Sequence, residues 1–312
     1  MNFKNVTVAG GGVLGSQIAL QSAYKGFNVT IWLRSESSIG RATPKLDRFC
    51  AVYVNTLEAM KTNPAAYARG LSDDSDLTDD QIDALKAQVK EARKGIKLTT
   101  SYEEAFRNAD LVIEAIAEDP KQKIEFYTEM AKRLPEKTVV VTNSSTLLPS
   151  TLAQYTGRPS KYLALHFAND IYRNNTAEIM GHAGTDKKYY DEVVEFAQAI
   201  GMVPLKLNKE QPGYILNSML VPFLSAAEAL AATGVADPET IDRTWMLATG
   251  APAGPFRILD VVGLTTAYNI VKMNPEAEDP KTTTGKIANM LKAYIDQGKL
   301  GINAGEGFYT YK

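Results

Sequence analysis

The segment that most constrains the fold of this chain follows directly after its first few residues. A β-branched run, residues 6–8, leads into three glycines spaced G-x-G-x-x-G, and an apolar helical pattern starts inside the last of them. The first glycine allows a tight turn, the second lets the backbone approach a ligand, and the third lets the helix pack close to the strand. Strand, glycine turn and helix in this order predict a site for the pyrophosphate of a dinucleotide at a helix N-terminus, with an ordinary glycine-rich turn as the alternative. The residues expected to line this site are Gly10, Gly12, Val13, Leu14 and Gly15.

The end of the second predicted strand, residues 28–33, bears on which dinucleotide binds. NAD-binding folds usually place Asp or Glu there, which accepts hydrogen bonds from the ribose hydroxyls and repels a 2′-phosphate. This chain instead has Leu33, followed by Arg34 and Ser35. A planar guanidinium and a hydroxyl both bind phosphate oxygens, so the sequence favours NADP. Binding of NAD, with Arg34 stacked on the adenine, is the alternative.

Composition narrows the class of partner. The 34 basic and 36 acidic residues nearly cancel, so no broad basic surface favours nucleic acid or membrane headgroups, and a small molecule is expected. A single cysteine cannot form an internal disulfide or supply a cysteine-based metal cluster. The chain starts without a signal-peptide pattern and has no apolar run approaching about 20 residues. We therefore expect a cytoplasmic protein without a metal site.

Strand-like and helical segments alternate up to about residue 207. Alternation of this kind predicts a mostly parallel sheet with ligands at the carboxyl ends of its strands. After the first two strands, further strands are expected at residues 96–99, 109–116, 138–142, 162–165 and 177–180. Two helices, 44–63 and 79–94, are expected to form a hairpin that projects from this domain.

The pattern of alternating strands and helices ends at about residue 207. A polar break covers residues 208–213, and everything after it reads as helix. We therefore predict an α/β fold: a Rossmann-type dinucleotide-binding domain with a helical hairpin insertion, residues 1–208, and an all-α C-terminal domain, residues 209–312. The helices expected in the second domain are 214–233, 238–249, 254–273 and 284–297.

The candidate for acid–base chemistry is His166, one of only two histidines. It ends an apolar strand, and Glu178 follows twelve residues later in another strand-like run. A return hairpin would place the carboxylate beside the imidazole, where it fixes the tautomer and stabilises the protonated form. A structural histidine is the alternative. Asn217, an amide in an otherwise apolar helix, needs a polar partner, which is either a ligand or neighbouring backbone.

Taken together, these segments resemble the L-3-hydroxyacyl-CoA dehydrogenase family over nearly the whole chain. The segments that carry the resemblance are VAGGGVLGSQIA, DLVIEAIAEDPKQK, TNSST, LHFAN followed by Glu178, QPGYILNSMLVPFLSAAEAL, GAPAGPFRILDVVGL and GEGFYTYK. The resemblance implies reversible oxidation of a 3-hydroxyacyl thioester, an active site between the two domains, and a homodimer formed through the C-terminal domain.

The resemblance also implies roles for individual residues. His166 matches the catalytic histidine and Glu178 its partner, and Ser145 and Asn217 match residues that contact the substrate. The residues that match or adjoin cofactor-contacting positions are Glu118, Lys123, Asn143 and Asn169.

This chain departs from the family pattern in three places. The acid at the strand end is absent, Asp170 replaces the proline of H-F-x-N-P, and residues 44–61 hold no match for the serine and lysine that touch CoA. The polar stretch 171–176 favours a short or polar acyl group. We therefore predict a short-chain enzyme of the 3-hydroxybutyryl-CoA type. The alternatives are a dehydrogenase of a free polar hydroxy acid, gulonate- or carnitine-like, and a non-catalytic nucleotide-binding protein.

Overall fold

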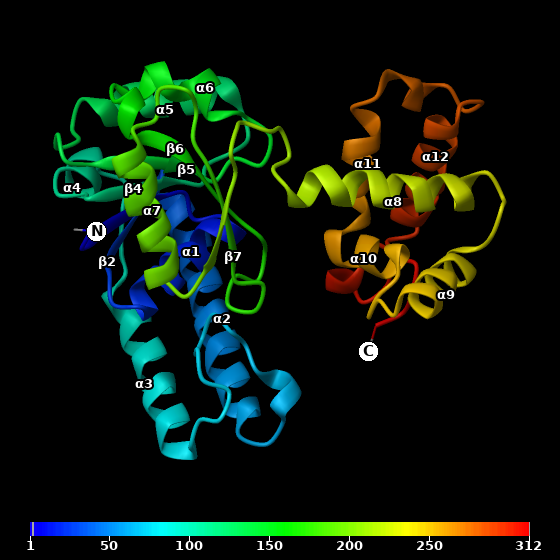
Figure 1. The fold of residues 1–312 in the computed structure, drawn as a ribbon, viewed down its shortest axis with the longest axis horizontal. Helices are drawn as coiled ribbons and strands as arrows, with labels where there is room; N and C mark the ends of the chain where they lie inside the picture. Colours follow the sequence, from blue (N-terminus) through cyan, green and yellow to red (C-terminus); the bar gives the residue numbers. More distant parts are fainter. Residues whose placement is uncertain (2, 312) are drawn as a thin grey trace. The chain divides into compact units, whose positions relative to one another are not determined.

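The computed structural model of the protein describes residue 1 and residues 3–311. It divides into two compact units, Met1–Ile215 and Leu216–Lys312 (Figure 1). Residues 209–215 pack with the first unit, since the Tyr214 hydroxyl donates to the Ser144 carbonyl and the Ile215 N–H donates to Glu178. None of the helices described is both long enough and apolar enough to cross a membrane.

The first unit is built on one eight-stranded sheet with the order β3-β2-β1-β4-β5-β6-β7-β8. Neighbouring strands are parallel except β6 and β7, which form an antiparallel pair, as the sequence pattern predicted. The strand β8 was not expected from the sequence. The strands are β1 Asn5–Ala9, β2 Asn28–Trp32, β3 Lys97–Thr99, β4 Leu111–Glu114, β5 Val139–Thr142, β6 Tyr162–Phe167, β7 Thr176–Met180 and β8 Val203–Lys206.

Apolar cores cover both faces of this sheet. Successive side chains of a strand point to opposite faces, so Val139 and Val141 enter one core while Val140 enters the other. Because both faces are buried, the strands are almost continuously apolar, which explains why they could be recognised from the sequence. The helices of this unit are α1 Val13–Tyr24, α2 Glu36–Met60, α3 Asp79–Gly95, α4 Tyr102–Phe106, α5 Pro120–Ala131, α6 Pro149–Leu152 and α7 Lys187–Ala199.

The helices α2 and α3 form the expected hairpin and project together beyond the sheet (Figure 1). The predicted start at residue 44 was wrong, because α2 begins at Glu36 and contains Pro44 in its interior. A proline inside a helix costs a hydrogen bond. The helix continues through it because the flanking Ala42 and Leu46 are completely buried. The Gln21 amide of α1 donates to the Gly70 carbonyl in the loop between α2 and α3. This buried hydrogen bond ties the hairpin to α1.

The second unit is helical around its own core, which includes Phe256, Leu259 and Leu291. The sequence predicted one helix over residues 254–273, and this is wrong: the chain breaks at Gly263, whose φ of +90° ends one helix and begins the next. Its helices are α8 Leu216–Ala232, α9 Pro238–Thr249, α10 Pro255–Val262, α11 Leu264–Lys272 and α12 Thr283–Asp296.

Candidate active site

The antiparallel pair β6 and β7 brings His166 and Glu178 together. The two residues are direct register partners, so their side chains leave the same face of the sheet. The Nδ1 atom of His166 lies 3.0 Å from Oε2 of Glu178, and both side chains are buried. A buried carboxylate beside Nδ1 keeps the proton of the neutral ring on that nitrogen. Nε2 is therefore left as the acceptor.

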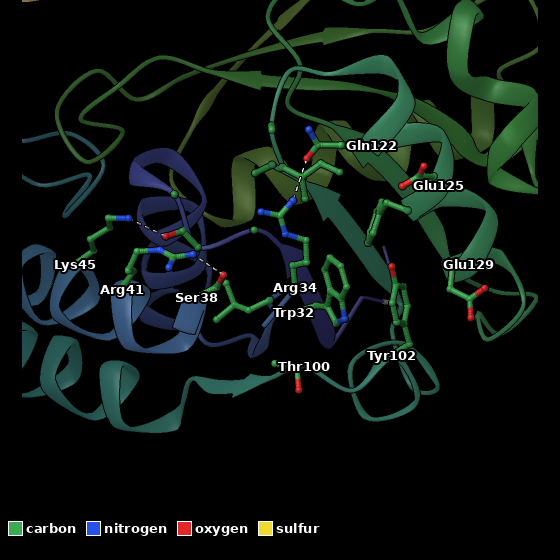
Figure 2. A pocket seen from close by; sticks show the side chains of 18 residues that line it. Trp32, Arg34, Ser38, Arg41, Lys45, Thr100, Tyr102, Gln122, Glu125 and Glu129 are labelled. Carbon is green, nitrogen blue, oxygen red and sulfur yellow. Dashed lines mark hydrogen bonds between the residues drawn. The ribbon is translucent and has the colours of Figure 1, made fainter. Parts of the chain in front are cut away.

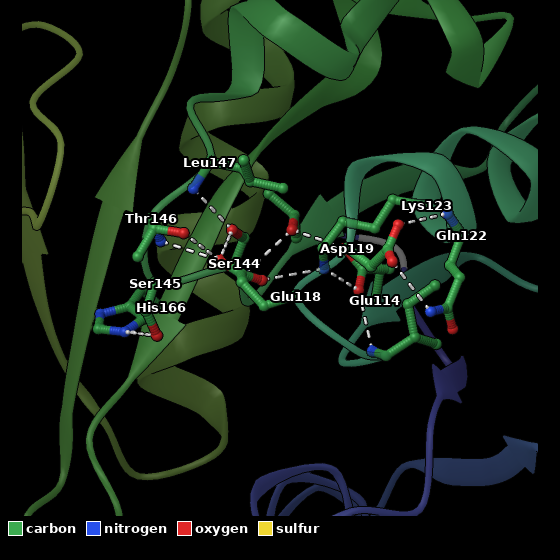
Figure 3. Close-up of polar contacts among 12 residues, drawn as sticks. Glu114, Glu118, Asp119, Gln122, Lys123, Ser144, Ser145, Thr146, Leu147 and His166 are labelled. Carbon is green, nitrogen blue, oxygen red and sulfur yellow. Dashed lines mark hydrogen bonds and ion pairs between the residues drawn. The ribbon is translucent and has the colours of Figure 1, made fainter. Parts of the chain in front are cut away.

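Ser145 lies on the other side of the imidazole. It follows β5, and its hydroxyl is 3.1 Å from Nε2 of His166 (Figure 3). The strands β5 and β6 are parallel neighbours, so their carboxyl ends deliver the serine and the histidine to the same edge of the sheet. The result is a hydrogen-bonded chain from hydroxyl to imidazole to carboxylate, which is the arrangement of a general acid–base group.

Sequence reasoning missed the aromatic ring that covers this imidazole. The ring of Tyr214 stacks on His166 with a centroid distance of 4.3 Å and an interplanar angle of 12°. The next residue, Ile215, donates its N–H to Oε1 of Glu178 at 2.9 Å. The segment was assigned to the start of a helix, although the preceding Pro212-Gly213 was a signal for a turn.

Asn217 is the second residue of α8 and belongs to the C-terminal unit. The other predicted site residues all belong to the N-terminal unit. The second histidine, His182, bonds to the Pro159 carbonyl and takes no part in the hydrogen-bonded chain. Within the described residues, no group of three or more His, Cys, Asp or Glu side chains is arranged to hold a metal ion.

The glycine turn fits the pyrophosphate of a dinucleotide. A Cβ on Gly15 would lie 2.2 Å from the Gly10 carbonyl oxygen, so the helix packs here against bare backbone. Gly12 instead borders open space, because no atom of the described residues lies within 4 Å of a Cβ built on it. Gly12 also precedes α1, which no described side chain caps. The helix N-terminus, with Val13 and Leu14 in its first turn, therefore faces open space with its N–H groups and positive dipole end.

A cavity of 650 Å³ extends from this turn along the end of β2 (Figure 2). Arg34, Arg41 and Lys45 line it with positive charge, whereas Glu125 and Glu129 of α5 line it with negative charge. Such a cavity accommodates the adenosine half of a dinucleotide. The guanidinium of Arg34 donates to Gln122 at 3.2 Å.

Arg41 was missed because the helix was expected to start later, whereas the serines up to Ser38 were expected to bind phosphate. Ser38, Arg41 and Lys45 are spaced three and four residues apart, so they lie on one face of α2. The Arg41 guanidinium donates to the Ser38 hydroxyl at 2.8 Å, and the Ser38 and Ser35 hydroxyls are 3.0 Å apart. Ser35 is the N-cap of α2. Hydroxyls, guanidinium groups and a helix N-terminus thus meet beside the cavity.

Glu118 and Lys123 belong to a polar network that runs toward Ser145 (Figure 3). The ammonium of Lys123 is buried between Glu114 at 2.6 Å and Glu118 at 3.4 Å. Glu118 in turn accepts hydrogen bonds from Ser144 and Thr146. Burial raises the pKa of Glu118, but the hydrogen bond from Ser144 and the charge of Lys123 outweigh this effect and hold the pKa below its ordinary value. The carboxylate therefore stays ionised next to the segment that carries Ser145.

The two predicted asparagines occupy different environments. Asn143 is buried and accepts a hydrogen bond from the Phe167 N–H at 3.0 Å, which ties the end of β5 to β6. Asn169 is exposed in the loop after β6. The next residue, Asp170, has a φ of +57°. Proline holds φ near −65°, so a chain with the family's proline at this position cannot follow the same path.

Comparisons with known proteins agree with these features. Residues 5–211 match the family model described as 3-hydroxyacyl-CoA dehydrogenase, NAD binding domain, and residues 213–311 match the model of the C-terminal domain of the same family. The chain is 31% identical over 311 residues to the mitochondrial hydroxyacyl-coenzyme A dehydrogenase of Homo sapiens, covering 99% of this chain and 91% of that protein. It is 28% identical to a probable 3-hydroxybutyryl-CoA dehydrogenase of Bacillus subtilis (strain 168), covering 100% and 99%.

Solved structures resemble the chain over its full length. A diketoreductase is 46% identical with a TM-score of 0.85 over 100% of both chains. FadB2 of M. tuberculosis is 26% identical with a TM-score of 0.80 over 99% of both chains. Both units of this chain are thus accounted for by one family, and the chain belongs to the 3-hydroxyacyl-CoA dehydrogenase family.

Proposed function

We propose that the protein interconverts (S)-3-hydroxyacyl-CoA and 3-ketoacyl-CoA, with a preference for short acyl chains such as 3-hydroxybutyryl. The observation that carries this proposal is the hydrogen-bonded chain Ser145–His166–Glu178 in a protein of this family. A bound nicotinamide cofactor accepts or donates the hydride in this chemistry.

The residues of the chain handle the proton. His166 takes the proton of the substrate hydroxyl at Nε2 during oxidation and returns it during reduction. Glu178, at 3.0 Å from Nδ1, balances the positive charge of the imidazolium. Ser145 holds the substrate oxygen close to Nε2, which positions the reacting carbon. Asn217 is proposed to contribute a further hydrogen bond to the substrate.

Replacement of the histidine tests this mechanism. His166→Ala is expected to lower kcat with acetoacetyl-CoA by roughly 10²- to 10⁴-fold, because the general acid is removed. His182→Gln is the matched control and should leave kcat unchanged, since the His182 ring bonds to the backbone of Pro159 and Gly184 and takes no part in the chain Ser145–His166–Glu178. Equal activity of the two variants would favour the alternative of a non-catalytic nucleotide-binding protein.

A second candidate substrate is a free dicarbonyl compound or polar hydroxy acid. The 46% identity to a diketoreductase described as acting on dicarbonyl compounds favours it, as do Asp170 and the missing CoA contacts. A 3-ketoacyl thioester is itself a dicarbonyl compound, so the two candidates share the reacting group and differ in what C1 carries. Initial rates with acetoacetyl-CoA, a C10 3-ketoacyl-CoA and a free acetoacetate ester separate them. If only the free ester is turned over at millimolar substrate, and neither CoA thioester is, the CoA proposal is wrong.

We further propose that NADP is preferred over NAD. Family membership supports a nicotinamide cofactor, and the cations and hydroxyls at the end of β2 support the 2′-phosphate. Each charge-assisted hydrogen bond contributes roughly 1.5–3 kcal/mol, so loss of Arg34 or Arg41 should raise the KM for NADPH by about 10- to 100-fold. The KM for NADH should change far less. Equal increases for both cofactors would contradict the assignment.

A homodimer formed through the C-terminal unit is also proposed. Apolar side chains are exposed on its surface, and Leu247 of α9 is 76% exposed. An apolar cavity of 550 Å³ between α8 and α9 is lined by Leu230 and Trp245, among others. Covering such a patch stabilises association. Light scattering should show a dimer that Leu247→Asp weakens, while a monomeric wild-type protein would refute the proposal. The cytoplasmic location remains a prediction from the sequence pattern and the single cysteine.

A further inference from the structure

The turn that precedes α8 holds one residue in an unfavourable backbone conformation. Gly213 and Tyr214 have φ values of +78° and +55°, and the Tyr214 N–H closes the turn on the Gln211 carbonyl at 3.0 Å. A side chain with a Cβ rarely adopts this left-handed conformation, and it persists only where the surroundings hold it. Tyr214 is 1% exposed, so the contacts of its buried ring hold the backbone in this conformation.

The side chain of Tyr214 connects two parts of the catalytic chain. Its ring lies nearly parallel to the imidazole of His166, and its hydroxyl donates to the Ser144 carbonyl at 2.7 Å. Burial raises the pKa of Tyr214 well above its ordinary value, so the hydroxyl keeps the proton that it donates. The Ser144 carbonyl is in the peptide that leads to Ser145.

The residue after Tyr214 completes these contacts. The Ile215 N–H binds Oε1 of Glu178, whereas Oε2 of the same carboxylate faces His166. Two consecutive residues thus touch the ring of His166, the carbonyl of Ser144 and the second oxygen of Glu178. An imidazole turns about its Cβ–Cγ bond, a broad torsion, and the Tyr214 ring packed on its face restricts that rotation.

We propose that Tyr214 is a positioning residue whose ring holds the plane of His166 in the geometry needed for proton transfer. The inference rests on the proposed role of His166 in the reaction. Misplacement of a proton acceptor by a fraction of an ångström slows the chemical step without weakening ligand binding. The expected signature is therefore a loss in kcat with little change in KM.

Two substitutions separate the ring from the hydroxyl. Tyr214→Met removes the planar face while filling the space with a flexible apolar chain. It should lower kcat by about 10- to 100-fold and leave the KM values for both substrates within about twofold. Tyr214→Phe keeps the ring and loses only the bond to the Ser144 carbonyl, so it should recover most of the activity. Tyr24 provides the control, because it is equally buried and donates to the Leu71 carbonyl at 2.8 Å. Tyr24→Met should leave kcat unchanged.

A kinetic isotope effect distinguishes positioning from general loss of structure. With a cofactor deuterated at the transferred position, a slower chemical step should raise the isotope effect on kcat in Tyr214→Met above that of wild type and of Tyr24→Met. If kcat and the isotope effect of Tyr214→Met match wild type, or if Tyr214→Phe is as impaired as Tyr214→Met, the inference is wrong. If wild type has no turnover or His166→Ala keeps full activity, the proposed function fails instead.

A measurement on folded protein covers the case in which Tyr214→Met does not fold. With ¹⁵N-histidine in a His182→Gln background, only His166 is labelled, since the chain has two histidines. Wild type and Tyr214→Phe should both show one tautomer, protonated at Nδ1, and contacts between the imidazole protons and the ring of residue 214. Averaged tautomers or absence of those contacts would overturn the proposal.

Discussion

Glu228 is an acid buried in the apolar core of the C-terminal unit. It lies on the face of α8 that also carries Leu224 and Ala227, both part of the apolar core. Its side chain is 2% exposed, and its Oε1 atom has no hydrogen-bond partner within the described residues. Burial alone raises the pKa of Glu228 to about 7 from an ordinary value of 4.5. The folded protein therefore prefers the protonated acid.

The consequence for stability follows from proton binding. Between pH 4.5 and about 7 the unfolded chain has released this proton while the folded chain still holds it. The free energy of unfolding therefore falls as the pH rises through this window and becomes constant above it. The difference between the two pKa values corresponds to about 3 kcal/mol. Glu228→Gln cannot ionise, so it should stabilise the unit by about 2–3 kcal/mol at pH 8 and change little at pH 4.5.

Denaturation by guanidinium at several pH values measures this effect. Trp245 lies in α9 and contacts Phe223 of α8, so a Trp32→Phe background leaves tryptophan fluorescence that reports on the C-terminal unit alone. The control is Glu239→Gln, which alters an exposed acid at the start of α9 and should change stability by only a few tenths of a kcal/mol. If Glu228→Gln and wild type give parallel curves from pH 4.5 to 8.5, the carboxyl is not linked to folding and the reasoning is refuted.

Three further predictions follow from the N-terminal unit. Lys123→Met leaves the carboxylate of Glu114 buried without its ion-pair partner and should destabilise the protein by about 3–5 kcal/mol in chemical denaturation. Gly12→Ala should melt like wild type but bind the cofactor at least about tenfold more weakly in titration, because its φ of −68° suits alanine and its Cβ enters the space facing the ligand. Gly15→Ala, whose Cβ meets backbone at 2.2 Å, should instead lose stability. Asp170→Pro should lower the free energy of unfolding by more than about 1 kcal/mol, whereas Asp170→Asn, which tolerates a positive φ, should not.

Most of the sheet could be predicted because its signals are local. The strands that support the site are buried at all of their four to six residues and begin with three or four consecutive apolar residues, so each is visible without knowledge of its neighbours. The start of α3 was equally visible, since Thr78 and Gln81 form a capping box. The placement of Glu178 opposite His166 followed from two short strands joined by a return loop, for which the twelve-residue separation is sufficient.

The errors lie where packing overrides local preference. Pro44 suggested the start of a helix, but burial of the residues around it carries α2 through the proline, and this brings Ser38 and Arg41 to the cofactor cavity. Gly263 lies inside the predicted helix 254–273, but its φ of +90° breaks the helix, and the N–H of the next residue, Leu264, bonds the distant Leu300 carbonyl.

By itself, the sequence determined the dinucleotide turn, most of the strands and the pair His166 and Glu178, because these depend on periodicity and on spacing within short stretches. The tertiary structure alone decided that Tyr214 covers the imidazole and that Glu228 is buried with no hydrogen-bond partner for Oε1 among the residues that the structure describes. Both depend on side chains from elements distant in the sequence, and no local pattern records which of them will meet. The catalytic residues could therefore be predicted from local strand patterns, whereas the contacts that position them depend on packing between distant parts of the chain.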